Sequence, residues 1–216
     1  MGTVSDSQSE ILRRIRSLHC VDGFDADLTY GNGGFWGEDD LPPPPIRLDI
    51  EPLVEGVTQA DSRSLPMDDG SLSSVVFDPP FLTYVRSGRE GNGGMVMARQ
   101  FGGYWRYDEL AEHYQSSLSE IARVLKPGGI AVFKCQDIVH NHRLHATGAN
   151  VIDWAANVNL RLLDLFILTA NHRLPSPNRA GVQRHARIHH SYFIVLQSVR
   201  SEEVPAGRGT RPGGDH

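Results

Sequence analysis

The chain has 216 residues, a formal net charge of −5, 39% hydrophobic and 22% charged residues, which is the composition of one ordinary globular domain. Its densest apolar stretch, residues 160–170, is interrupted by Arg161 and Asp164, so we expect no membrane-spanning helix. Two cysteines, Cys20 and Cys135, are too few for a disulfide framework or an ordinary zinc site, and the N-terminus lacks the apolar core of a secretory signal, so we expect a reduced, cytoplasmic protein.

The first half of the chain shows one helical pattern followed by several short apolar runs. Ser7 and Glu10 form a capping-box pattern ahead of apolar residues at helical spacing, which predicts a helix over residues 8–18. Four consecutive prolines within residues 38–45 predict a loop, because proline can continue neither a helix nor a central strand. Strands are expected over residues 24–29, 46–50, 56–61 and 74–78.

In the second half, helical and strand patterns alternate. Apolar residues on one helical face predict a helix over residues 107–125, which Pro127-Gly128-Gly129 ends. Short strands alternating with helices predict an α/β fold with a mostly parallel sheet. We expect residues 1–200 to form one domain and residues 201–216, rich in glycine, proline and charge, to be a disordered tail. The other expected elements are strands over residues 130–134, 162–170 and 191–197 and a helix over residues 149–159.

Polar residues gather where the expected strands end. A glycine-rich turn over residues 30–34 follows the first strand, and Asp49, Asp61 and Asp78 stand at the ends of the next three. In a parallel sheet, ligands bind outside the carboxyl ends of the strands. These features are therefore expected to form one binding site at one edge of the sheet.

The strongest single motif is Asp78-Pro79-Pro80-Phe81, directly after an apolar strand. Its two prolines fix the backbone and remove two N–H donors, which leaves a rigid corner rich in carbonyl acceptors. A carboxylate and a prolyl carbonyl can accept the two N–H groups of a base amino group, and Phe81 offers a face for a base turned out of its helix. A strand terminator with Asp78 as a cap explains the same four residues equally well.

Taken in order, the motifs resemble those of the amino-group DNA methyltransferases, which methylate N6 of adenine or N4 of cytosine. Asp-Pro-Pro-Phe after a strand resembles the catalytic motif of that family. Residues 27–36 resemble its first cofactor motif, although they lack the common Phe-x-Gly-x-Gly form, and residues 125–129 (Leu-Lys-Pro-Gly-Gly) are similar to the helix-to-strand link of class I methyltransferases. The resemblance covers about residues 25–198. It implies S-adenosylmethionine as cofactor and a three-layer, Rossmann-like class I methyltransferase sheet, mostly parallel with an antiparallel last strand.

The resemblance also implies which residues form the site. Asp49 matches the acidic position that binds the ribose hydroxyls of the cofactor, and a carboxylate is a strong acceptor for them. Asp61 and Ser62 resemble the adenine-side segment, and Asp27 is expected to pair with the ammonium group of the cofactor. A carboxylate at the start of a helix remains an alternative for Asp49, and a helix cap for Asp61 or Ser62. The implied cofactor-binding residues are Asp27, Thr29, Tyr30, Gly31, Gly33, Phe35, Trp36, Asp49, Asp61, Ser62 and Asp78, and the implied catalytic residues are Asp78, Pro79, Pro80 and Phe81.

Two expected loops are rich in arginine although the chain is acidic overall. Residues 83–106 combine four arginines with six glycines and several aromatic side chains, which suits a lid that contacts DNA phosphates and fills the gap left by a flipped base. Residues 171–190 hold four arginines, four histidines and no acid. Both loops could equally be solvated surface. The expected nucleic-acid contacts are Arg86, Arg89, Arg99, Arg106, Arg173, Arg179, Arg184 and Arg187.

Three histidines, His140, His142 and His145, lie close together in the sequence. Their spacing lacks the partner cysteine or carboxylate of a metal site, so we assign no metal. We expect them to be exposed residues at the start of a helix.

The predicted activity is direct in-line transfer of a methyl group to the exocyclic amino nitrogen of adenine or cytosine in duplex DNA, with the target base flipped out. The alternatives are an RNA base-amino methyltransferase, a small-molecule methyltransferase and a catalytically silent cofactor-binding subunit. The acid-diproline motif and the arginine-rich loops favour a nucleic acid over a small molecule, and the intact motifs favour an enzyme over a silent subunit. The choice between adenine and cytosine, the recognition sequence and the oligomeric state stay open.

Overall fold

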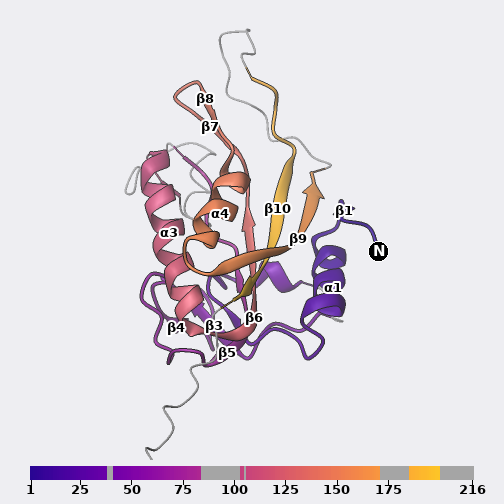
Figure 1. The fold of residues 1–216 in the computed structure, drawn as a ribbon, viewed down its shortest axis with the longest axis vertical. Helices are drawn as coiled ribbons and strands as arrows, with labels where there is room; N and C mark the ends of the chain where they lie inside the picture. The colour runs from indigo at the N-terminus through magenta and orange to yellow at the C-terminus, as the bar shows by residue number, and fades with distance from the viewer. Residues whose placement is uncertain (38–40, 84–102, 105, 171–184, 200–216) are drawn as a thin grey trace, which may run out of the picture.

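The computed structural model describes residues 1–37, 41–83, 103–104, 106–170 and 185–199. The expected disordered tail, residues 201–216, lies outside them. A sheet of eight strands runs through the molecule in the order β1-β9-β10-β6-β5-β2-β3-β4 (Figure 1). Its strands are β1 (Val4–Ser5), β2 (Ala26–Asp27), β3 (Ile46–Asp49), β4 (Thr58–Gln59), β5 (Leu72–Phe77), β6 (Leu125–Cys135), β9 (Leu160–Thr169) and β10 (His190–Ser198).

All strands of this sheet except β10 run in one direction. β10 pairs antiparallel with β6 on one side and with β9 on the other. β2 pairs parallel with β3 and β5, and β5 pairs parallel with β6. The remaining pairs, β3 with β4 and β1 with β9, are also parallel. The predicted mostly parallel α/β sheet with an antiparallel last strand is therefore confirmed.

Helices cover both faces of the sheet and complete three layers (Figure 1). α1 (Gln8–His19) and the short 3-10 turn η1 (Gly34–Trp36) pack on one face, and α3 (Tyr107–Val124) and α4 (Thr147–Ala156) pack on the other. α1 begins as the capping pattern predicts, because the Ser7 side chain accepts from the Glu10 backbone nitrogen at 3.2 Å. Among the described residues, no helix has the length and apolar content needed to cross a membrane.

A small hairpin that the sequence did not predict follows β6. β7 (Ile138–His140) and β8 (Arg143–His145) pair antiparallel. Asn141 and His142 join them, with φ angles of 50° and 57°. Positive φ at both central residues defines a type I′ turn, whose twist matches that of a hairpin. Asparagine and histidine adopt this conformation more readily than most residues, so glycine is not required here.

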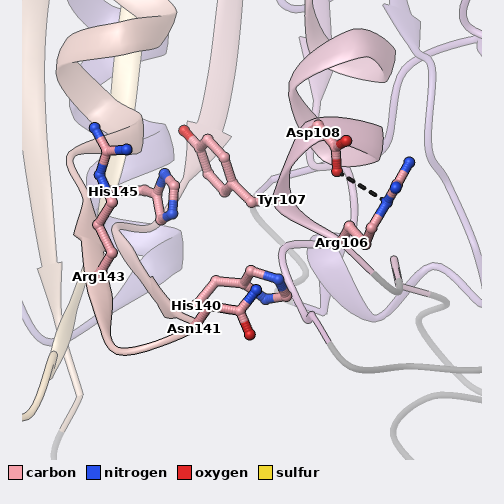
Figure 2. A pocket seen from close by; sticks show the side chains of 7 residues that line it. All are labelled: Arg106, Tyr107, Asp108, His140, Asn141, Arg143 and His145. Carbon is pink, nitrogen blue, oxygen red and sulfur yellow. Dashed lines mark ion pairs between the residues drawn. The ribbon is translucent and has the colours of Figure 1, made fainter.

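The hairpin makes the expectation for the three histidines wrong. His140 is 6% exposed, and His145 stacks on Tyr107 with ring centroids 3.7 Å apart, so only His142 of the three is exposed. α4 begins after the hairpin, at Thr147, and the histidines therefore do not start it. Figure 2 shows His140 and His145 beside the first residues of α3.

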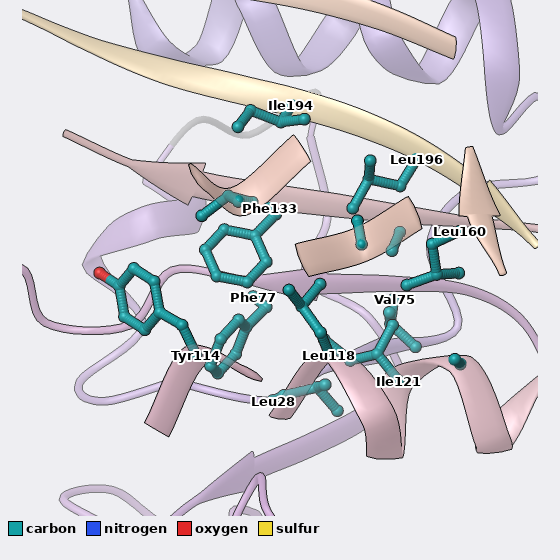
Figure 3. Packing of buried hydrophobic residues seen from close by; sticks show 14 of the residues in the cluster. Leu28, Val75, Phe77, Tyr114, Leu118, Ile121, Phe133, Leu160, Ile194 and Leu196 are labelled. Carbon is teal, nitrogen blue, oxygen red and sulfur yellow. The ribbon is translucent and has the colours of Figure 1, made fainter. Parts of the chain in front are cut away.

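Successive side chains of the central strands point to opposite faces of the sheet and contribute to a separate hydrophobic cluster on each face. In β5, Val75 and Phe77 belong to the cluster under α3, whereas Val76 belongs to the cluster under α1. The Phe133 ring of β6 lies edge-on to Phe77, with centroids 5.0 Å apart, and to Tyr114 of α3, at 5.1 Å. Figure 3 shows these three rings packed together between the sheet and α3.

The crossings between β2, β3, β4 and β5 contain turns instead of α-helices, as far as their residues are described. Asp49 therefore does not stand at the start of a helix, and neither Asp61 nor Ser62 caps one. These results exclude the helix-terminus explanations for the three residues. Pro127-Gly128-Gly129 also differs from expectation, because it lies within β6, which continues directly from α3.

Phe77→Ala should lower the free energy of unfolding by about 3–5 kcal/mol, because it leaves a cavity between Phe133 and Tyr114 in a fully buried position. The control is Leu144→Ala on β8, where the side chain is 52% exposed and the expected change is within about 0.5 kcal/mol. Denaturant unfolding at a constant m-value measures both changes. Equal midpoints for the two variants would contradict this packing.

Candidate functional site

The glycine turn, residues 30–34, and the acid-diproline corner, Asp78-Pro79-Pro80-Phe81, meet at the carboxyl edge of the sheet. The Asp78 backbone nitrogen donates to Thr29 Oγ1 at 2.8 Å, and the Leu28 nitrogen donates to the Val76 carbonyl at 3.0 Å. On the other side, the Tyr30 nitrogen donates to the carbonyl of Leu48 in β3 at 2.9 Å. The end of β2 is thus held between β5 and β3, and the expected features do share one edge.

Asp27 shapes the turn from inside. Its side chain is 1% exposed and accepts from the Thr29 backbone nitrogen at 2.8 Å and from Trp36 Nε1 at 2.7 Å. Burial, assisted by the nearby charges of Asp78 and Asp49, raises the pKa of Asp27 to about 7 against these two hydrogen bonds. The carboxylate lies behind the surface of the turn, so its expected pairing with a cofactor ammonium group stays a prediction.

The glycine turn presents an open backbone beside Asp49. Gly31 and Gly33 have φ angles of 57° and 81°, which favour glycine. A Cβ on Gly33 would lie 2.9 Å from the Tyr30 hydroxyl, whereas a Cβ on Gly31 would meet nothing within 4 Å. Half-buried Asp49 accepts from the backbone nitrogens of Gly31 at 2.7 Å and Glu51 at 2.8 Å. The open side of Gly31 and the Asp49 carboxylate therefore lie together and can face a ligand.

The acid-diproline corner is anchored on α3. The Tyr114 hydroxyl donates to the Pro80 carbonyl at 3.1 Å, and Pro79 is buried. Phe81 is half-buried and packs against the same hydrophobic cluster as Tyr107. The corner is thus fixed in place while part of the Phe81 ring stays accessible.

Lys134, near the end of β6, is a site residue that the sequence analysis missed. Its Nζ lies 3.0 Å from Asp78 Oδ2 and donates to Gln8 Oε1 of α1 at 2.9 Å. It also lies over the rings of Phe35 and Phe193, at 5.2 Å and 5.5 Å from their centroids. Its side chain is only 11% exposed. A single lysine in the otherwise apolar run of a central strand was the available signal.

Ser62 is tied into a polar network with α3. Its hydroxyl lies 2.9 Å from His113 Nε2 and 2.8 Å from Ser117 Oγ, and the Tyr104 hydroxyl contacts His113 Nδ1. Burial lowers the pKa of His113 to about 4, and the charge of Arg63 adds to this shift. The network connects the segment expected near the cofactor adenine to the chain that follows the acid-diproline corner.

Asp61, the neighbouring predicted contact, is engaged by a single arginine. Arg63 Nε and Nη2 donate to its carboxylate in a two-pronged pair, with the shortest distance 2.6 Å. Hydrogen bonds from Arg63 lower the pKa of Asp61. The pair is partly exposed, so Asp61 stays near the surface, whereas Ser62 is buried.

Two of the eight predicted nucleic-acid arginines lie among the described residues. Arg106 pairs with Asp108 at 3.2 Å and Glu109 at 3.4 Å at the start of α3. Arg187 is exposed just before β10. The other six, and with them most of the two predicted loops, lie outside the described residues: Arg86, Arg89, Arg99, Arg173, Arg179 and Arg184.

Comparison with known proteins identifies the fold. No family profile and no curated protein sequence matches this chain. A solved structure of a DNA modification methylase from Thermus thermophilus shares 16% identity over 68% of this chain and 54% of its own, with a TM-score of 0.43. A chain in the complex of the Haloferax volcanii activator Trm112 with a methyltransferase shares 15% identity over 88% of this chain and 89% of its own (TM-score 0.52). A sarcosine dimethylglycine methyltransferase from Galdieria sulphuraria shares 14% identity over 88% and 84% (TM-score 0.50).

These similarities show the fold alone, which is the class I methyltransferase fold. One fold hosts many different reactions, so the fold does not define the reaction partner. This chain spans little more than half the length of the Thermus thermophilus methylase.

His113 should contribute a loss of stability as pH falls from about 6.5 toward 4, because it stays neutral in the folded state while it binds a proton in the unfolded state. Asp27, whose pKa is raised, contributes with the opposite sign over this range, so the His113 part is the difference between the wild type and a His113 variant. The loss from this group amounts to about 3 kcal/mol when fully developed. His113→Gln should remove that part of the pH dependence, whereas His142→Gln, at an exposed position, should leave it unchanged. Denaturant unfolding across this pH range measures the difference, and parallel curves for wild type and His113→Gln would contradict the assignment.

Proposed function

We propose that the chain is an S-adenosylmethionine-dependent methyltransferase that acts on the exocyclic amino group of adenine or cytosine in DNA. The observation that carries the proposal is the hydrogen bond from the Asp78 backbone nitrogen to Thr29 Oγ1 at 2.8 Å. It places the acid-diproline corner beside the glycine turn, and a methyl donor and an acceptor amine need such proximity. The substrate class rests on the corner motif, because the fold supports many substrates.

The glycine turn and Asp49 fit the cofactor. The open side of Gly31 lets the backbone approach a ligand closely. Each Asp49 oxygen accepts one backbone N–H and keeps a further lone pair for a ribose hydroxyl. When bound, S-adenosylmethionine supplies an electrophilic methyl group on a sulfonium centre. We assign direct contacts to Gly31 and Asp49, and the shaping of the turn to Asp27, Thr29, Gly33 and Trp36.

The acid-diproline corner supplies acceptors for an amine. Lys134 Nζ donates to Asp78 Oδ2, and none of the described residues donates to Oδ1. Oδ1 can therefore accept one N–H of the target amino group. The Pro79 carbonyl is the proposed acceptor for the other N–H, since the Pro80 carbonyl already accepts from Tyr114. Holding both N–H groups orients the nitrogen lone pair and disperses the positive charge that develops on nitrogen. The amine then releases a proton, so Asp78 need not be a strong base.

Lys134 is the proposed positioning residue for Asp78. A cation that is 11% exposed needs a charged partner and hydrogen bonds, and Asp78 and Gln8 provide them. The ion pair fixes the Asp78 side chain with Oδ2 turned inward. Oδ1, to which no residue in the described part of the chain donates, is the proposed acceptor for the substrate, and α1 supports the site through Gln8.

Asp78→Ala should lower methyl transfer to DNA by at least about 10²-fold while cofactor affinity stays close to that of the wild type. Asp49→Ala should instead weaken cofactor binding as its primary effect. Asp153→Ala removes an exposed carboxylate of α4 and should change neither. A radiolabelled-methyl assay and calorimetric titration of the cofactor give the two readouts. Full activity of Asp78→Ala would refute the proposed chemistry.

The same assay on duplex DNA and on RNA of matching sequence tests which nucleic acid is the substrate. Transfer to DNA supports the proposal, whereas transfer to RNA alone supports an RNA base-amino methyltransferase. Cofactor binding without transfer to either supports a silent cofactor-binding subunit or a small-molecule enzyme. Mass spectrometry of the nucleosides then identifies N6-methyladenine or N4-methylcytosine as the product.

Lys134→Met should reduce the transfer rate by about 10²-fold with little effect on cofactor affinity, because Asp78 loses the partner that holds its orientation. Lys134→Arg should restore part of the rate, since it returns the charge. The matched control is Lys126→Met at the opposite end of β6, where the lysine is exposed and contacts Ser73. Equal rates for Lys134→Met and Lys126→Met would show that the ion pair has no part in the reaction.

A further inference from the structure

A pocket of about 420 Å³ lies between the first residues of α3 and the β7–β8 hairpin (Figure 2). It lies near the acid-diproline corner, because the backbone nitrogen of Tyr104, three residues before Tyr107, donates to the carbonyl of Leu82, directly after Phe81, at 2.9 Å. β7 follows the end of β6 that carries Lys134. Its volume is within the range of small-molecule and nucleotide sites. The lining residues are Arg106, Tyr107, Asp108, His140, Asn141, Arg143 and His145.

A pair of aromatic rings forms one wall of the pocket. The rings of Tyr107 and His145 are stacked, with centroids 3.7 Å apart and an interplanar angle of 27°. The Tyr107 hydroxyl accepts from Asn150 Nδ2 at 2.9 Å, which holds the ring in place. Burial lowers the pKa of His145, and the charges of Arg143 and His140 add to the shift, which favours the neutral imidazole. The pair is therefore an ordered, uncharged aromatic surface.

The charge of the pocket comes from Arg143. Arg106 is neutralised by Asp108 at 3.2 Å and Glu109 at 3.4 Å. Arg143 is exposed, and in the described part of the chain no carboxylate pairs with it. An exposed guanidinium beside an aromatic pair is complementary to a phosphate next to a base. Arg143 thus provides a local positive charge in a chain whose net charge is −5.

We propose that this pocket binds a nucleotide next to the target base, with that base against the Tyr107–His145 pair and its phosphate on Arg143. The inference rests on the proposed function and extends it, because it names a contact that a polynucleotide makes and a free nucleoside lacks. It also assigns a role to the β7–β8 hairpin. Aromatic stacking accepts any base, so this contact fixes the position of the strand without reading its sequence.

The test compares Arg143→Ala and His145→Ala with the matched control Arg161→Ala in the full-length protein. Arg161 is also exposed, but it lies at the start of β9, at the opposite edge of the sheet. Fluorescence anisotropy with a labelled duplex DNA oligonucleotide gives affinities over a series of salt concentrations, and an RNA oligonucleotide of the same sequence is measured in parallel. Cofactor binding and thermal unfolding of each variant show that the fold and the cofactor site are intact.

We expect Arg143→Ala to weaken oligonucleotide binding and to lower the salt dependence by about one phosphate contact. His145→Ala should weaken binding about tenfold at unchanged salt dependence. An abasic position next to the target base should remove most of the His145 effect. Arg161→Ala should behave as the wild type.

Two different failures can be told apart. If the wild type binds and methylates DNA while Arg143→Ala and His145→Ala match Arg161→Ala, the pocket assignment is wrong and the proposed function stands. If the wild type binds the cofactor but neither oligonucleotide, the proposed function fails and the pocket assignment fails with it. If the variants lose affinity only for the RNA oligonucleotide, the pocket binds a nucleotide as proposed, but the nucleotide belongs to RNA and not to DNA.

Discussion

The hydrogen bond between the Asp78 backbone nitrogen and Thr29 Oγ1 joins the two corners on which the site depends. Neither corner is built on an α-helix, and each follows a strand that would be free to splay at its end. The threonine hydroxyl closes the gap between β2 and β5 just beyond their last paired residues, Asp27 and Val76. The relative position of the turn and the corner is thereby set by two paired strands, and residues held on strands are positioned more precisely than residues held on loops.

A buried carboxylate, Asp27, and a largely buried ammonium group, Lys134, lie beside this junction. Asp27 is enclosed by the turn and holds Trp36, whereas Lys134 is enclosed by α1 and two phenylalanine rings and holds Asp78. Burying either group alone would be costly, so each requires the partners that the fold brings to it. The same contacts that satisfy these groups also give the site its shape, and they link stability to the geometry of the carboxyl edge.

Local signals in the sequence account for most of the fold. α1 and α3 end within one residue of their predicted ranges, because a capping pattern and a continuous apolar face mark them. Lys134 could not be assigned in this way, since its partner Gln8 is 126 positions away in the chain. The hairpin was missed because Asn141 and His142 form its turn without glycine. The burial of Asp27 depends on the closure of the turn around it, which residue types alone do not specify.

The crossing from β2 to β3 has a consequence for ligand charge. In its described residues it contains only η1, three residues long, where a full α-helix would add its peptide dipoles into a macrodipole with a positive amino end. Three amides of the turn are already committed, since the nitrogens of Gly31, Gly33 and Gly34 donate to Asp49 Oδ2, the Tyr30 carbonyl and Asn32 Oδ1. We therefore expect side-chain cations to match a negative ligand group at this turn, and binding through them would weaken with added salt as surface ion pairs do.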